Sequence, residues 1–221
     1  VNLTAIVSMA DDGGSSGVLR EEFGILPPGD VRRALVAMAH ADKSILSQLF
    51  NYRFEEGGLH GHSFGNIMLT GLERLTGSFE KAVEQASLML GVGGSVLPVT
   101  LDNVRLFAEL EDGRVIRGEN NIDVPKHDGR VKIVNAWLEP KAHINVKARD
   151  AILRANIVVI GPGDLYTSII PNLLVEGVSK ALRETRAKKI YVVNIMTKWG
   201  ESNGLNAGGF IRAIERFLGD G

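Results

Sequence analysis

Short apolar runs alternate with amphipathic segments at both ends of this 221-residue chain, and this pattern restricts the fold more than any other feature. Residues 1–9, IVVI at 157–160 and IYVVNIM at 190–196 are all largely apolar. Strands without a polar face are typical of parallel sheets that are covered on both sides. The order strand, loop, helix therefore predicts an α/β fold, with a mostly parallel sheet and helices on both faces.

The middle of the chain has a different character. VLPVT at 96–100 and VKIVNAWLEP at 131–140 resemble strands, and Asp112-Gly113 stands between alternating residues as a hairpin turn does. We therefore expect a small antiparallel insert at about 95–140. Because no internal repeat or long linker is present, residues 1–221 are predicted to form a single α/β domain.

Helical spacing recurs along the chain, and Asp30 is the natural N-cap of one helix because it follows Pro27, Pro28 and Gly29. Helices are predicted at 31–39, 43–50, 65–75, 79–90, 146–155, 171–186 and 208–218. The first residue is Val1, already inside a strand, so we expect the sequence to be a fragment of a longer protein.

Composition excludes several classes of function. The chain has no cysteine, which rules out disulfides, thiolate zinc sites and a cysteine nucleophile. Its 25 Lys and Arg against 26 Asp and Glu argue against a general nucleic-acid binder. No apolar run reaches the ~20 residues of a membrane span, and no signal peptide is visible. We expect a protein without a membrane span, and the absence of cysteine fits a reducing compartment.

Three predicted strands end in loops rich in glycine, hydroxyls or both: ADDGGSSG at 10–17, GPGDLYTS at 161–168 and NIMTKWGES at 194–202. Ligands of open parallel sheets bind beyond the carboxyl ends of the strands. Bare amides of Gly13, Gly14, Ser15 and Ser16 suit phosphate oxygens. Asp11 and Asp12 are then candidate ligands of Mg²⁺. The alternative is an ordinary turn in which one aspartate caps the following helix.

The stretch GHSFG at 61–65 fits the G-x-S-x-G pattern of serine hydrolases. That pattern requires a buried strand immediately before the serine, whereas FEEGGLH is polar and rich in glycine. We therefore expect Ser63 to be a helix N-cap and His62 to project from a loop toward the backbone or a ligand phosphate. His60 and His62 alone are too few ligands for a zinc site.

Five stretches in a fixed order give the chain a family resemblance: ADDGGSSG, PPGDVRRAL, LHGHSFGN, GPGDLYTSIIPNLLV and NIMT. They resemble those of the bacterial YvcK-type gluconeogenesis factors, within the CofD-like superfamily, from Val1 to about Gly219. The resemblance implies a Rossmann-like fold and a homodimer. It also implies a cytoplasmic protein that binds UDP-sugars such as UDP-N-acetylglucosamine and supports cell shape and wall synthesis on gluconeogenic carbon sources.

The same resemblance assigns roles to individual residues. It implies catalytic or metal-binding roles for Asp11, Asp12 and Asp30. The implied ligand-binding residues are Gly13, Gly14, Ser15, Ser16, Arg32, His62, Ser63, Asn66, Gly161, Gly163, Leu165, Tyr166, Thr167, Ser168, Asn194 and Thr197. The ring of Tyr166 is expected either to stack on a base or sugar or to pack in the interior.

Two functions follow from the resemblance. The first is a regulator that binds a nucleotide sugar without turnover. The second is a Mg²⁺-dependent transferase of the 2-phospho-L-lactate transferase type, which moves a phospholactyl group from a nucleotide-linked donor to a deazaflavin. In the second, Asp11 or Asp12 holds the metal and Asp30 orients the acceptor hydroxyl.

The chain also departs from the family pattern. A glycine-rich strand and turn that normally come first would lie before Val1. MTKWGES replaces the usual MTQPGET, which places Lys198 and Trp199 at the expected rim of the site. The last helix lacks the histidine that relatives tend to have there.

Overall fold

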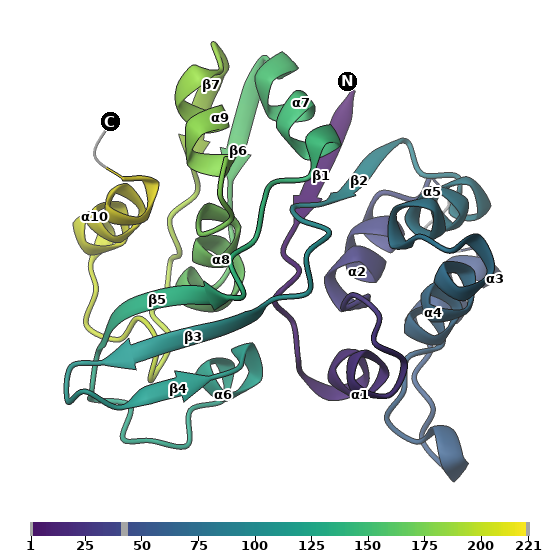
Figure 1. Cartoon of the computed structure of the whole chain (residues 1–221), viewed down its shortest axis with the longest axis horizontal. Helices are drawn as coiled ribbons and strands as arrows, with labels where there is room; N and C mark the ends of the chain where they lie inside the picture. The colour runs from purple at the N-terminus through teal and green to yellow at the C-terminus, as the bar shows by residue number, and fades with distance from the viewer. Residues whose placement is uncertain (1, 41–43, 220–221) are drawn as a thin grey trace. The chain divides into compact units, whose positions relative to one another are not determined.

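The computed structural model describes residues 2–40 and 44–219. The backbone divides into two compact units, Val1–Asn103 and Val104–Gly221. Figure 1 labels the helices and strands of both units. The predicted strand and helix starts at Val1 and Lys43 lie outside the described residues. The prediction of a single domain stays a prediction, and each unit is described here by itself.

The first unit is a parallel strand pair with helices. β1 and β2 pair in parallel from Leu3 opposite Gly94 to Val7 opposite Pro98. Because parallel strands require a long connection, all the helices of this unit lie between the two strands in the sequence. Its elements are β1 (Leu3–Val7), α1 (Gly14–Phe23), α2 (Gly29–Ala37), α3 (Ile45–Asn51), η1 (Gly57–Leu59), α4 (Phe64–Thr76), α5 (Phe79–Leu90) and β2 (Gly94–Pro98).

The second unit combines an antiparallel sheet, a second parallel pair and helices (Figure 1). The antiparallel sheet has the order β4-β3-β5, and β6 pairs in parallel with β7. Its elements are β3 (Arg105–Leu110), β4 (Val115–Arg117), α6 (Glu119–Asp123), β5 (Ile133–Glu139), α7 (Val146–Arg154), β6 (Ile157–Ile160), η2 (Leu165–Ile169), α8 (Ile170–Leu173), α9 (Val178–Glu184), β7 (Lys188–Tyr191) and α10 (Ala207–Leu218).

The mixed α/β class, with parallel strands, helices and an antiparallel sheet, is confirmed. The antiparallel part is narrower than the expected insert at 95–140, because β2 pairs in parallel with β1 and the antiparallel strands span residues 105–139. The alternation of buried and exposed residues along β3 is typical of an antiparallel sheet with one covered face. Residues 106, 108 and 110 of β3 are buried, while residues 105, 107 and 109 are partly exposed.

One predicted helix is divided in the structure. Residues 171–186 read as a single helix, but α8 ends at Leu173 and α9 begins at Val178. Gly177 has a φ of 98°, a conformation that interrupts a right-handed helix. The amide of Glu176 donates to the carbonyl of Ala142, and the carbonyl of Glu176 accepts from Ile144. These contacts with a distant segment replace the helical hydrogen bonds.

Among the residues that the structure describes, no helix has both the length and the apolar composition needed to cross a membrane.

Candidate functional site

The acidic loop of the first unit joins β1 to α1, and the helix begins inside the Gly/Ser motif. Gly13 is the N-cap of α1 and has no side chain that could make a capping hydrogen bond. Asp11 Oδ1 accepts the Gly13 N–H at 3.0 Å. The N-cap residue is therefore a glycine and not an aspartate, and Asp11 fixes the turn that precedes the helix.

The two serines of the motif lie in the first turn of α1, and both are buried. Ser15 Oγ accepts the Ser63 N–H at 3.2 Å and lies 3.2 Å from His62 Nδ1. Ser16 Oγ accepts from the Asn66 side-chain amide at 3.5 Å. The start of α4 is thus attached to the start of α1, although the two stretches are almost fifty residues apart in the sequence.

Arg32 extends this network from α2. Its side chain is buried, and Nε donates to Asn66 Oδ1 at 3.1 Å. One terminal nitrogen donates to Asn51 Oδ1 at 2.7 Å and to the Phe50 carbonyl at 3.5 Å. All of these acceptors are neutral. In the described part of the chain, no carboxylate lies within ion-pair distance of this guanidinium.

Asp30 lies one position into α2, not at its N-cap. The helix begins at Gly29 with Pro28 as N-cap, so the prediction of Asp30 as N-cap is wrong by two residues. A carboxylate in the first turn still interacts favourably with the helix dipole. Arg33 lies 3.7 Å away. Burial, reinforced by the negative charge of Asp11, raises the pKa of Asp30 from 3.8 to about 6.

Because Gly29 has no side chain, the Asp11 carboxylate and the Ser16 hydroxyl can lie close to the start of α2. A Cβ at this position would lie 2.4 Å from Asp11 Oδ2 and 2.5 Å from Ser16 Oγ. The PPGD motif places this glycine before a predicted helix, but its steric role depends on residues that are distant in the sequence. We call the polar group that it borders the Gly/Ser cluster: Asp11, Ser15, Ser16, Asp30, Arg32, His62 and Asn66.

Replacing Asp30 with asparagine is expected to stabilise the metal-free protein at neutral pH. A carboxyl whose pKa is raised on folding costs stability once it ionises, so the cost develops as the pH rises from about 4 to about 6. We expect Asp30→Asn to gain about 1–2 kcal/mol at pH 7.5, after allowance for partial solvent screening, and almost nothing at pH 4. Urea unfolding at both pH values measures this, and an equal effect at both would contradict it.

Two predicted loops of the second unit meet each other. β6 and β7 are parallel neighbours, so their carboxyl ends lie at the same edge. Glu201 Oε1 accepts the amides of Tyr166 and Thr167 at 2.6 and 3.3 Å. The amides of Ser168 and Ile169 both donate to the Asp164 carbonyl. The amides of residues 166–169 are therefore already occupied and are not bare groups for a phosphate.

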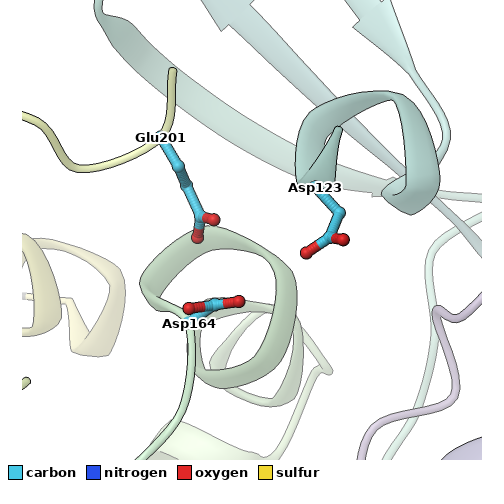
Figure 2. A group of neighbouring side chains, drawn as sticks. All are labelled: Asp123, Asp164 and Glu201. Atoms are coloured by element: carbon cyan, nitrogen blue, oxygen red, sulfur yellow. The ribbon is translucent and has the colours of Figure 1, made fainter. Parts of the chain in front are cut away.

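A charged cluster stands beside this loop. Asp123, Asp164 and Glu201 each offer an oxygen within 4.8 Å of the others, and Figure 2 shows the three carboxylates pointing toward one another. Lys198 Nζ lies 2.8 Å from Asp164 and 3.5 Å from Glu201, and it also bonds Asp123. We call these four residues the Lys198 cluster. Its three carboxylates resemble those of a metal-ion site, and the ammonium of Lys198 is the cation that they surround.

The electrostatics of the Lys198 cluster follow from these contacts. Burial lowers the pKa of Lys198, but its hydrogen bonds to Asp123 and Asp164 outweigh burial and raise the pKa overall. Burial raises the pKa of Glu201, whose side chain is 0% exposed. Lys198 was expected at a rim, but it lies among these carboxylates. Neither the cluster nor the role of Glu201 was predicted, because only the folded chain brings α6 to this loop.

The remaining candidates of the second unit fall into two groups. Leu165, Tyr166 and Thr167 are buried. The Tyr166 hydroxyl donates to the Ile133 carbonyl at 3.4 Å, and its ring meets that of Phe217 edge to face at 6.3 Å. These contacts favour the packing role of Tyr166 over stacking on a ligand. The more accessible candidates are Gly161, Gly163, Ser168, Asn194 and Thr197.

Ser63 does not form a nucleophile elbow. Its side chain is 1% exposed, and its hydroxyl donates to the Phe50 carbonyl at 3.4 Å. A short 3-10 helix, η1, and a turn precede it where a hydrolase requires a strand. Ser63 is the N-cap residue of α4 as predicted, but its side chain makes no capping hydrogen bond.

The fold and the acidic Gly/Ser loop after β1 place this chain in a class of α/β proteins. Comparison with known proteins identifies its family. The family model described as 2-phospho-L-lactate transferase CofD matches residues 1–221. A relative from Nostoc sp. is 52% identical over 99% of this chain. The gluconeogenesis factors of Halalkalibacterium halodurans and Bacillus subtilis are 45% and 43% identical over 100% of it. The chain belongs to the CofD family and is similar to its gluconeogenesis factors.

Solved structures agree with this assignment. Two crystal structures of a Bacillus halodurans protein, one titled as a member of the upf0052 family, match with TM-scores of 0.94 and 0.93 at 44% identity. They cover 99% of this chain, which in turn spans 70% and 69% of theirs. This chain spans 47% of the Nostoc relative and 68% of the Halalkalibacterium one.

Proposed function

We propose that this chain is a regulatory nucleotide-sugar-binding protein that holds the phosphates of a UDP-sugar, such as UDP-N-acetylglucosamine, at the Gly/Ser cluster. Similarity to proteins named gluconeogenesis factors supports this proposal. Four parts of the proposal are inferred from the family resemblance: the UDP-sugar ligand, the role in cell shape on gluconeogenic carbon sources, the cytoplasmic location and the homodimer.

The single observation that carries the proposal is the position of Arg32. A buried guanidinium usually pairs with a carboxylate, because an uncompensated charge in the interior is costly. The recorded hydrogen-bond partners of Arg32 are neutral oxygens. Through Asn66, this cation is connected to Ser16 in the first turn of α1, where the helix dipole is positive. Asp30 and Asp11 act on this cation only through space, and a phosphate group would supply an anionic partner in direct contact.

Magnesium is the proposed cofactor, and the carboxylates of the cluster suit it. Asp11 and Asp30 are close enough for the charge of Asp11 to raise the pKa of Asp30. A divalent cation would relieve that repulsion, and Mg²⁺ binds through one or two carboxylates and ligand phosphates. The metal role of Asp12 stays a prediction. When bound, Mg²⁺ would neutralise pyrophosphate charge, while Arg32 and the Gly/Ser turn would orient the phosphates.

Calorimetry with UDP-N-acetylglucosamine, with and without Mg²⁺, tests the proposal directly. We expect binding that weakens at least about 10-fold in Arg32→Gln, since a hydrogen bond to a charged group contributes about 1.5–3 kcal/mol. Arg33→Gln is the matched control, because Arg33 is an exposed neighbour on the same helix. Equal affinities of the two variants, with both folded by circular dichroism, would exclude the cluster as the phosphate site.

A second candidate function is a Mg²⁺-dependent transferase of the 2-phospho-L-lactate transferase type. The match of that family model to residues 1–221 supports it. In this function, Asp11 or Asp12 would hold the metal and Asp30 would orient the acceptor hydroxyl. Incubation with a nucleotide-linked phospholactyl donor and a deazaflavin measures this activity. Product formation that is lost in Asp30→Asn would favour the transferase over the regulator.

A further inference from the structure

The hydroxyl of Ser15 has two polar neighbours, and together they determine where its proton lies. The Ser63 N–H points to Ser15 Oγ at 3.2 Å and therefore uses one lone pair of that oxygen. The other neighbour is His62 Nδ1, also at 3.2 Å. Ser15 is 5% exposed, so water has little access to satisfy the hydroxyl in another way.

The available acceptor for the proton of the Ser15 hydroxyl is His62 Nδ1. If Nδ1 instead carried a proton and donated to the second lone pair of the oxygen, the buried hydroxyl proton would have no acceptor among the described residues. A backbone amide can only donate, so the hydroxyl cannot give its proton to Ser63. In a neutral imidazole, a ring nitrogen that accepts a hydrogen bond carries no proton, and the proton then resides on the other nitrogen. For neutral His62, this arrangement selects the tautomer with hydrogen on Nε2.

We propose that Ser15 is a positioning residue that holds His62 as an Nε2–H donor, and that this N–H contacts a phosphate oxygen of the nucleotide ligand. The second clause rests on the proposed function, whereas the tautomer does not. The His62 ring is partly exposed, and Ser15 is its recorded side-chain partner in the described part of the chain. The other ring nitrogen is therefore available to a ligand.

The chemistry of the ligand follows from the donor. A phosphate or pyrophosphate oxygen only accepts hydrogen bonds, so it requires an N–H, and the opposite tautomer would present a lone pair. Ser15 and Ser16 are neighbours in the first turn of α1, and Ser16 leads through Asn66 to Arg32. His62, the neutral donor, and Arg32, the buried cation, are thus both connected to the first turn of α1. This arrangement suits an extended anion with more than one phosphate group.

A purely structural role for Ser15 predicts different behaviour. If the hydroxyl served only to connect α1 to α4, its loss would lower stability and leave both the preferred tautomer and the relative affinities of His62 variants unchanged. The tautomer of His62 is therefore the readout that separates a positioning role from a structural one.

The first experiment is nitrogen NMR of the histidine rings in the full chain. The protein has five histidines, and His62→Gln identifies the signals of His62 by their loss. At pH 8, we expect the Nε2–H tautomer in the wild type and in Ser15→Thr, which retains the hydroxyl. In Ser15→Ala, we expect that preference to be lost. An Nδ1–H tautomer in the wild type, or no change in Ser15→Ala, would overturn the proposal.

The second experiment compares two replacements of the histidine itself. A glutamine amide places a donor near the position of Nε2, whereas the shorter asparagine amide reaches only the region of Nδ1. With UDP-N-acetylglucosamine and inorganic pyrophosphate as probes, we expect His62→Gln to bind within about 3-fold of the wild type and His62→Asn to bind about 10-fold more weakly.

The outcomes of the two experiments are distinguishable. Binding of neither probe to the wild type would overturn the proposed function and the ligand contact of His62, while the NMR result would still decide the tautomer. Wild-type binding with equal affinities of the glutamine and asparagine variants would overturn the ligand contact alone.

Discussion

Replacing Lys198 with methionine is expected to lower the free energy of unfolding by about 2–3 kcal/mol at pH 7.5. The ammonium of Lys198 contacts Asp123, Asp164 and Glu201, and methionine has a similar length without the charge. Three carboxylates would then face one another without a cation. Because Lys198 is 29% exposed, we place the loss below that of a fully buried pair.

The loss should depend on pH. Without the ammonium, the three ionised carboxylates repel one another in the folded variant. Protonation of the carboxylates reduces this repulsion. The loss of unfolding free energy relative to the wild type should therefore be largest above about pH 7 and shrink as the pH falls toward about 4. A deficit that is constant across this range would show that the lysine acts through packing and not through its charge.

Lys180→Met is the matched control for this substitution. Lys180 pairs with Glu184 at 3.8 Å on α9, and the two side chains are 72% and 46% exposed. An exposed helical pair contributes about 0.3–0.5 kcal/mol. Chemical unfolding of both variants, at the same pH and salt concentration, should therefore separate them by about 2 kcal/mol.

Replacing Gly29 with alanine is expected to weaken nucleotide-sugar binding at least about 10-fold, which corresponds to about 1.4 kcal/mol. The added Cβ would lie 2.4 Å from Asp11 Oδ2 and 2.5 Å from Ser16 Oγ, so both polar groups would have to move. These atoms are the ends of side chains, and for that reason we expect the fold to survive while the Gly/Ser cluster loses its geometry.

Gly71→Ala is the control for Gly29→Ala, because both glycines lie in helices. Gly71 is exposed on α4, and a Cβ there would meet nothing within 4 Å. Alanine at this position should raise stability by about 0.5–1 kcal/mol and leave affinity unchanged. Calorimetry and thermal unfolding of the two variants measure both quantities. Normal affinity in Gly29→Ala would remove the cluster from the proposed binding site.

Local sequence patterns predicted most of the secondary structure, and the family resemblance named the residues of one of the two clusters. The apolar runs and helical spacing located most of the strands and helices, because hydrophobic periodicity is a property of neighbouring residues. The motifs around Ser15, Arg32 and His62 were recognised as one set because they occur in the same order in the family that the chain resembles. The division of the predicted helix at 171–186 was missed, since it depends on hydrogen bonds between Glu176 and the segment at 142–144.

The hydrogen-bond partners of polar side chains could be identified only from the folded structure. Asn51 was not a candidate, yet it accepts from Arg32 across 19 positions of sequence. Glu201 stood in a stretch interpreted as the rim of a ligand site, and it instead accepts the amides of Tyr166 and Thr167. No pattern of nearby residues marks such a carboxylate, because its role depends on the adjacency of β6 and β7.

The sequence by itself therefore determined the α/β class, the order of the elements and the residue types gathered at the Gly/Ser loop. Only the tertiary structure decided which amides are already occupied, which carboxylates share a lysine and which neutral oxygens accept hydrogen bonds from the buried Arg32. The physical reason is the range of the interactions. Periodicity and helix initiation act within a few residues, whereas the contacts of Ser15 and Lys198 join residues 47 and 75 positions apart.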